Sequence, residues 1–70
     1  GQAVLQMTLT APMHVRLSLM NLLGQELLVH DEGVVQTVRR ELDMRAFTPG
    51  MYCLHITAGD RTMIRKLVRQ

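Results

Sequence analysis

A chain of 70 residues has room for one small domain and no second hydrophobic core. Such a domain buries only about 60% of the surface that its unfolded form exposes, so a deep catalytic cleft is not expected. The composition, 47% hydrophobic and 20% charged, is typical of a globular protein, and no apolar run approaches the ~20 residues that span a bilayer. The net charge of +2 is too small to indicate a strongly basic protein. We therefore expect residues 1–70 to form one soluble folded module.

Apolar residues recur at every second position in the first half of the chain, which predicts β-strands. Pro12 cannot donate to a central strand ladder, so it is expected to separate the first two strands. Asn21-Leu22-Leu23-Gly24 is typical of a hairpin loop, in which Gly24 supplies a positive φ. The expected strands cover residues 4–10, 14–20 and 25–30.

The second half of the chain predicts three further strands after a reversal at residues 31–33. Arg40 falls on the face that should be buried, which indicates an edge strand or a bulge. Residues 43–47 are expected to form a single helical turn, capped by the aspartate at its start, and residues 48–50 a tight Pro-Gly turn. Six short strands joined by glycine turns indicate an all-β sandwich or small barrel. The last three expected strands cover residues 34–42, 51–57 and 62–69.

The final strand is the most basic part of the chain. Phe47 and Tyr52 are the only aromatic residues, so there is no platform on which nucleic-acid bases would stack, and nucleic-acid binding is not expected. The favoured interpretation is a solvated basic edge that discourages strand-to-strand aggregation. Lys66 and Arg69 fall on opposite faces by the period of two, and both are expected to reach solvent. Half of the eight basic residues lie in the last ten positions, with no acid among them: Arg61, Arg65, Lys66 and Arg69.

The residues that often carry chemistry do not form a recognisable site. Cys53 is the only cysteine, lies in a predicted strand and is expected to act as a small buried hydrophobe. His14, His30 and His55 fall on different strands without the spacing of zinc ligands. Cys53 and His55 lie about 7 Å apart along a strand, too far for direct proton transfer. We therefore expect no metal, no cofactor and no enzymatic activity.

Three stretches of the chain resemble the C-terminal sorting domain of the type IX secretion system of Bacteroidetes. The first is VRLSLMNLLGQE, residues 15–26, an alternating strand that leads through a turn to Gly24 and a polar pair. The second has the family's apolar-x-x-Gly-x-Tyr pattern followed by alternating apolar residues, and the third is a closing Lys-apolar-Val strand. The matching residues of the last two stretches are Phe47, Gly50, Tyr52, Leu54, Ile56, Lys66, Leu67 and Val68.

The resemblance implies an immunoglobulin-like β-sandwich of six to seven antiparallel strands. The family's usual Asn-Pro strand is missing here, so the chain is either trimmed or a variant without that strand. The implied function is that of an address, which carries cargo through the periplasm and the outer-membrane translocon to the cell surface. Implied partners are translocon or shuttle proteins and a sortase-like peptidase that removes the domain. Candidate sorting-motif residues are Gly24, Gly50, Tyr52, Lys66, Leu67, Val68, Arg69 and Gln70.

Two further hypotheses remain open from the sequence. The alternative function is a structural or adhesive immunoglobulin-like module appended to a larger cell-surface enzyme. An exposed sheet edge and the short hinge at Ala11-Pro12 also predict a homodimer formed by strand swapping. Gly50 and Tyr52 are expected to matter mainly for folding, because Tyr52 shares a face with other apolar residues of its strand.

Overall fold

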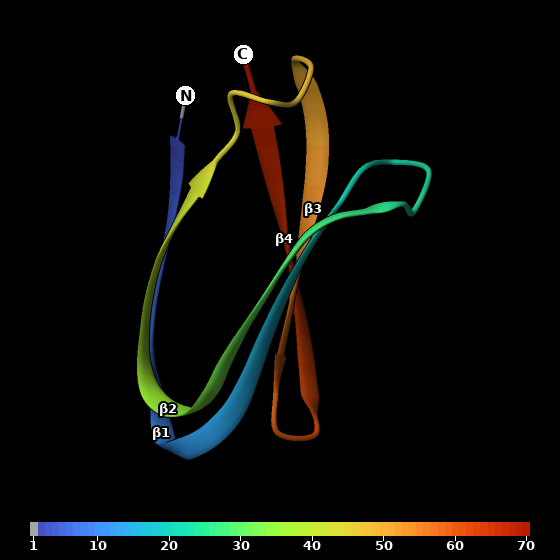
Figure 1. Ribbon diagram of the computed structural model, residues 1–70. Helices are drawn as coiled ribbons and strands as arrows, with labels where there is room; N and C mark the ends of the chain where they lie inside the picture. Colours follow the sequence, from blue (N-terminus) through green and yellow to red (C-terminus); the bar gives the residue numbers. More distant parts are fainter. Residues whose placement is uncertain (1) are drawn as a thin grey trace.

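The computed structural model describes residues 2–70, which form a single sheet of four antiparallel strands (Figure 1). The strand order in the sheet is β2-β1-β3-β4, so β2 and β4 are its edge strands. Arg40 lies on β2, which confirms the edge position that its place in the sequence indicated. The strands are β1 (Gln2–Met20), β2 (Glu26–Asp43), β3 (Gly50–Ala58) and β4 (Arg61–Arg69).

The all-β, antiparallel prediction is confirmed, but the structure has four strands where the sequence predicted six. Pro12 and residues 31–33 lie inside strands and do not end them. The β1–β2 register shifts between Thr8 and Met13, so Pro12 falls in a stretch without a ladder partner and its missing N–H costs nothing there. Gly33 has a φ of 72° at a second irregularity, which only glycine adopts readily. Both signals of a reversal therefore mark bulges within long strands.

The long β1–β2 hairpin is strongly bent, as the blue and green ribbons of Figure 1 show. β3 pairs only with residues 15–20 of β1. The opposite end of the hairpin, residues 2–8 of β1 paired with 37–43 of β2, is here called the arm. Apolar residues of the arm, such as Leu5 and Leu42, belong to the same core cluster as Leu54 of β3. The bend thus lays the arm over the inner face of β3 and β4 and creates a core from one sheet.

Alternating residues of β1 and β3 form the centre of the core. Val15, Leu17 and Leu19 are at most 1% exposed, and Leu54 and Ile56 of β3 lie directly across from this segment. Fully burying one such side chain contributes roughly 1.5–3 kcal/mol. The period of two in the sequence therefore identified the buried faces of these strands correctly. The remaining core residues are Val38, Leu42, Met44, Tyr52 and Ala58.

The two main connections are held by asparagine and aspartate side chains. Asn21 Oδ1 accepts hydrogen bonds from the backbone N–H of Leu23 and of Gln25, both at 3.0 Å. Gly24 has a φ of 82°, so the predicted hairpin loop is confirmed. Between β2 and β3 the prediction of a helical turn is wrong. The chain forms a tight turn, because Phe47 donates its N–H to Met44 O and Asp43 Oδ1 accepts from the N–H of Arg45.

Within residues 2–70 the structure contains no helix long and apolar enough to cross a membrane.

Candidate functional site

Most of the predicted sorting-motif residues meet where β3 begins and β4 ends. Gly50 pairs with Arg69, and Tyr52 pairs with Leu67. Met51 and Cys53 of β3 pair with Val68 and Lys66 in the same ladder. Gln70 follows β4 directly, whereas Gly24 lies in the separate loop between β1 and β2. The structure therefore brings together the second and third of the stretches that resemble the sorting domain, whereas Gly24 of the first stretch lies elsewhere.

Tyr52 anchors this end of β3 in the core. Its side chain is 5% exposed, and its hydroxyl donates a hydrogen bond to the carbonyl oxygen of Thr48. Its ring lies 5.9 Å from that of Phe47, with a tilt of 42° between the planes. This arrangement fixes the turn before β3 to the strand itself. Tyr52 is thus part of the scaffold of the site and unavailable for contact with a partner.

The two faces of β4 differ in character. Residues directly opposite each other in an antiparallel pair share a face, so Met63 and Leu67, opposite Ile56 and Tyr52, point to the core. Arg65 lies opposite the buried Leu54 and belongs to this inner face as well. The inner face therefore alternates basic and apolar residues in the order Arg61, Met63, Arg65, Leu67 and Arg69. The outer face carries the exposed residues Thr62, Ile64, Lys66 and Val68.

The charges of β4 lack acidic partners, unlike those elsewhere in the molecule. Residues 2–58 contain five acids: four form ion pairs with arginines of β1, β2 or the following turn, and the fifth, Asp31, is hydrogen-bonded to His14. The sixth acid, Asp60, lies in the turn before β4. Within the part of the chain that the structure describes, no ion pair involves Arg61, Arg65, Lys66 or Arg69.

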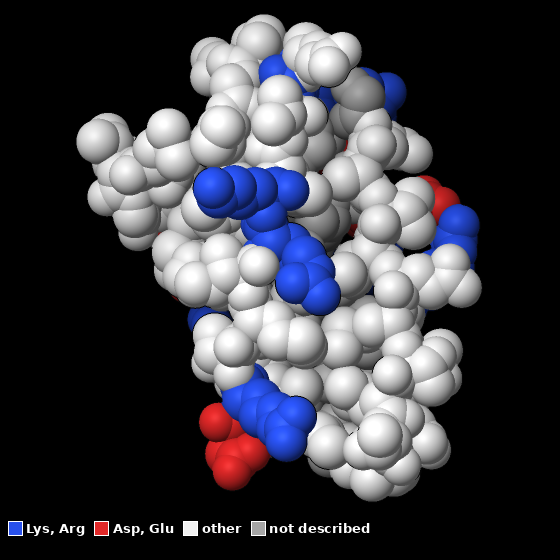
Figure 2. Space-filling model, turned by 180° about the vertical axis from the view of Figure 1, so that it is seen from behind, with Lys and Arg blue, Asp and Glu red and all other residues white. Residues whose placement is uncertain are grey.

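Figure 2 shows lysine and arginine side chains along the middle of the face opposite to that of Figure 1. Acidic side chains in this view lie mainly at the lower end and at one margin. Because an uncompensated positive region attracts negatively charged groups, this surface favours an acidic partner.

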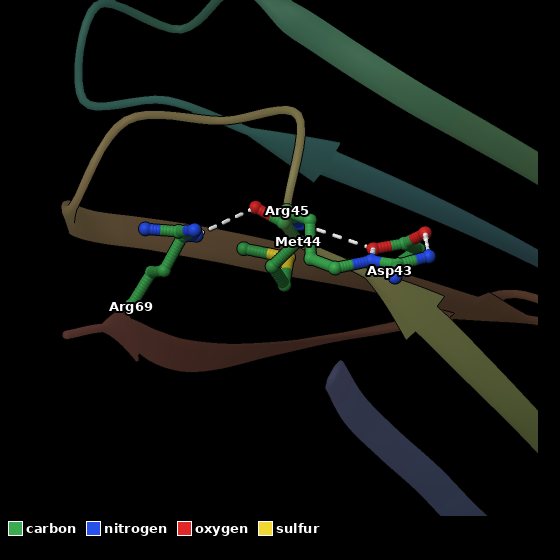
Figure 3. A network of polar contacts seen from close by, with 4 residues as sticks. All are labelled: Asp43, Met44, Arg45 and Arg69. Carbon is green, nitrogen blue, oxygen red and sulfur yellow. Dashed lines mark hydrogen bonds and ion pairs between the residues drawn. The ribbon is translucent and has the colours of Figure 1, made fainter. Parts of the chain in front are cut away.

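Arg69 is held more firmly than the sequence predicted. Its Nε donates a hydrogen bond of 2.7 Å to the carbonyl oxygen of Met44, whose side chain is buried (Figure 3). Arg69 is half-buried, so it reaches solvent only in part, whereas Lys66 is exposed as expected. The reason is tertiary, because the bent β2 brings the turn after Asp43 beside the end of β4. That turn is itself fixed by Arg45, whose guanidinium donates to both oxygens of Asp43.

These hydrogen bonds also alter the acidity of the turn. The Arg45 side chain, and next its backbone N–H, hold the pKa of Asp43 well below its ordinary value. At neutral pH the carboxylate of Asp43 therefore stays charged and keeps the turn in place. The end of β4 is attached to this fixed turn through Arg69.

An open seam lies between β4 and residues 2–10 of β1. Three hollows of ≈ 310, 240 and 520 Å³ follow one another along this seam, each lined by residues of both strands. Leu42, Leu54 and Leu67 supply the apolar lining, here called the floor, of the middle hollow, and Arg65 and Lys66 also line it. Each hollow is much larger than the ~30 Å³ that one water molecule occupies in the liquid, so the seam has room for side chains.

The seam, Arg61 and Arg65 were missed by the sequence interpretation, which placed the candidate sorting residues of this strand at residues 66–70. The available signal was the alternation of basic and apolar residues in the final strand.

The other residues that often carry chemistry do not come together in one site. In residues 2–70 the structure brings no three His, Cys, Asp or Glu side chains together in the manner of a metal site. Cys53 is half-buried, and His14 instead pairs with Asp31 at 2.7 Å.

Comparison with known protein families places the chain beside one described family. The family described as the secretion system C-terminal sorting domain matches residues 2–70, which is essentially the whole chain. No curated protein matches the chain significantly, and no solved structure does.

Proposed function

Because the chain belongs to the family of secretion system C-terminal sorting domains, we propose that β4 and its basic edge form the address that the secretion machinery recognises. Membership implies a type IX sorting signal, interaction with the type IX machinery and export to the cell surface or beyond. The finer proposal concerns which surface is recognised, by what partner, and what happens to the domain afterwards.

The observation that carries the proposal is the contrast between the paired acids of residues 2–58 and the unpaired cations of β4. Exposed charges contribute little to stability, usually under ~1 kcal/mol, so the exposed cations Arg61, Arg65 and Lys66 of this edge strand are not needed for folding. An edge strand also offers free backbone N–H and C=O groups to a partner. Both properties favour recognition of β4 by a translocon or shuttle protein.

The domain acts, in this proposal, as a passive signal without catalytic activity. After the cargo has passed through the periplasm and the outer membrane, a sortase-like peptidase cuts upstream of the domain and the cargo is anchored at the surface. Membership of the family supports the export step, and the buried core around Tyr52 suits a domain that must reach the machinery intact.

Two structural proposals accompany this function. The bent sheet encloses its core between the arm and the β3–β4 hairpin, and this layering favours an immunoglobulin-like sandwich. Strand swapping would exchange the first part of β1 between two copies. The bulge around Ala11 and Pro12, where the β1–β2 ladder is interrupted, supports this location for the hinge.

A structural or adhesive module of the cell surface is the second candidate function. The exposed apolar residues Leu22 and Leu23, 69% and 85% exposed at the tip of the β1–β2 hairpin, favour it, because such a tip suits contact with another surface. In this case the chain would be carried by its parent protein and would direct nothing by itself.

The test is to fuse residues 1–70 to the C-terminus of an unrelated reporter in a bacterium with a working type IX system. We expect the reporter to reach the surface or the medium, and to remain inside when the translocon is disrupted. Deletion of residues 67–70 should abolish export, because it removes Leu67 from the core and the end of β4 from the edge. Retention of the intact fusion in the periplasm would refute the sorting function and favour the adhesive module.

A further inference from the structure

Two strand edges with unpaired backbone groups face the seam. Among residues 2–70, β4 is hydrogen-bonded on one side only, because β3 is its sole neighbour in the sheet. Residues 2–8 of β1 pair with β2 but not with β3, whose partners in β1 begin at Val15. An extended chain laid in the seam would therefore find free N–H and C=O groups along β4 and the edge of β1 as its opposite wall.

The side chains of β4 that line the seam have a regular chemical pattern. The inner face carries a basic residue at every fourth position and an apolar residue midway between: Arg61, Met63, Arg65, Leu67 and Arg69. Arg69 uses its Nε for the bond to Met44, which leaves the other donors of its guanidinium group for a partner. In an added strand, residues opposite these positions would share their face and contact them directly.

We propose that the seam binds an extended segment of a partner protein as an added strand along β4, and that this segment carries an acidic residue at every fourth position with an apolar residue midway. The acids pair with the arginines, and the apolar residues cover Met63, Leu67 and the floor of the seam. The main-chain bonds supply affinity, and the spacing of the side chains supplies specificity. This inference describes how the partner recognises the export signal, and it therefore rests on the proposed function.

A second copy of this chain is a poorer occupant of the seam. An antiparallel β4–β4 pair centred on Arg65 would place Arg65 opposite itself and Arg61 opposite Arg69. Like charges directly opposite each other destabilise a strand pair. Five of the six acids that could offset them already have basic partners within residues 2–58, which leaves one acid, Asp60, against the four cations of β4 in each copy. Charge complementarity therefore favours an acidic segment from another protein.

The first experiment uses a designed, end-capped peptide of nine residues, Glu-Thr-Leu-Thr-Glu-Thr-Leu-Thr-Glu, titrated into the 70-residue chain. Its control, Leu-Thr-Glu-Thr-Glu-Thr-Glu-Thr-Leu, has the same composition and charge but the wrong spacing. We expect the first peptide to bind at least about fivefold more tightly, with weaker binding at higher ionic strength. Amide chemical shifts should change along β4 and residues 2–10 and stay constant along the outer edge of β2.

Variants of the chain locate the contact. Arg65→Gln should weaken binding about threefold, and Arg61→Gln with Arg65→Gln about tenfold, as expected for exposed ion pairs. The matched control is Arg39→Gln, which removes one exposed arginine of β2 that is paired with Glu41. It should leave the affinity unchanged. N-methylation of alternate residues of the peptide should abolish binding when the methyl groups replace the N–H groups that face β4.

Equal binding of the two peptides, binding that survives N-methylation of the N–H groups that face β4, or equal effects of Arg65→Gln and Arg39→Gln would overturn the proposal. Concentration-dependent dimerisation of the free chain through β4 would also overturn it, since a second copy would then occupy the seam. These binding measurements are independent of the export of the reporter, so the two proposals can fail separately. Loss of peptide binding with export intact refutes the seam alone, and binding without export refutes the sorting function.

Discussion

The two hairpins of this sheet differ in whether their charged side chains are paired. In the β1–β2 hairpin and the turn that follows it, arginine and acidic side chains form four ion pairs, including a bidentate pair between Arg40 and Glu32 at 2.8 and 3.0 Å, and His14 is hydrogen-bonded to Asp31. In the β3–β4 hairpin four cations stand without an acidic partner in the described chain.

This difference in charge pairing indicates that stability and recognition depend on different strands of one small domain. β3 supplies buried apolar residues, whereas β4 presents its charges and one free edge to the outside. A strand that only completed the sheet would gain from internal pairs like those of β2. The contrast therefore indicates that β4 keeps its charges for a partner, and the following predictions test it in order of expected effect.

Tyr52→Ala should unfold the domain. Replacing a buried aromatic residue by alanine typically costs about 3–5 kcal/mol, which is comparable to the total stability of a domain of this size. The control is Val68→Ala on β4, since Val68 is 63% exposed and its replacement should change stability by only about 0.5 kcal/mol. Thermal unfolding followed by circular dichroism distinguishes them. A normal transition in Tyr52→Ala would show that this end of β3 does not hold the core.

Arg40→Gln should lower the melting temperature more than Lys66→Gln does. Arg40 lies beside Glu32, whose side chain is only 12% exposed, so the change leaves a largely enclosed carboxylate without its partner. Lys66 is exposed and makes no ion pair in residues 2–70, so its charge is not needed for folding. Equal melting temperatures for the two variants would show that the charges of the two hairpins contribute equally to stability, which contradicts the proposed contrast.

The acid sensitivity of the fold should come from the paired carboxylates. The pKa of Asp43 is lowered from its ordinary value of 3.8 by hydrogen bonds from the side chain and backbone of Arg45. The pKa of Asp31 is lowered by the backbone N–H of Gly33 and by His14. A carboxyl group whose pKa is lower in the folded state stabilises the fold above its unfolded pKa, and this contribution is lost as the pH falls.

Stability measured by urea unfolding should therefore decline between about pH 5 and pH 2. Asp31→Asn with Asp43→Asn should flatten this decline, because the linked protons are no longer taken up on unfolding. Asp60→Asn, which removes the acid outside the ion pairs, should follow the unaltered chain. If the double variant keeps the full pH dependence, the paired carboxylates of the first hairpin are not its source.

The parts of the fold that were predictable from the sequence are those that depend on local periodicity. Alternation identified the buried faces of residues 15–19 and 52–56, and the Asn-to-Gly loop identified the first hairpin. Pro12 and Gly33 predict strand ends but lie in bulges, because a proline or a positive φ marks a turn and a bulge equally well. Only the register between β1 and β2 distinguishes the two cases.

The site was predictable only in part, because much of it depends on contacts distant in the sequence. The basic character of the last strand was evident, and Tyr52 was correctly placed in the core. The bond from Arg69 to Met44 joins residues 25 positions apart, and nothing near either residue indicates it. The seam exists because the arm bends over the sheet, which no pattern in β4 alone reveals.

The measurement that tests the central claim most directly is export of a C-terminally fused reporter carrying Arg65→Glu, compared with one carrying Arg39→Glu. Both variants reverse one exposed charge, the first on β4 and the second on the internally paired β2. Melting curves of the isolated domains establish that each variant is folded. We predict that Arg65→Glu loses most of its export while Arg39→Glu keeps it. Equal export of the two folded variants would contradict the claim that the unpaired charges of β4 serve recognition.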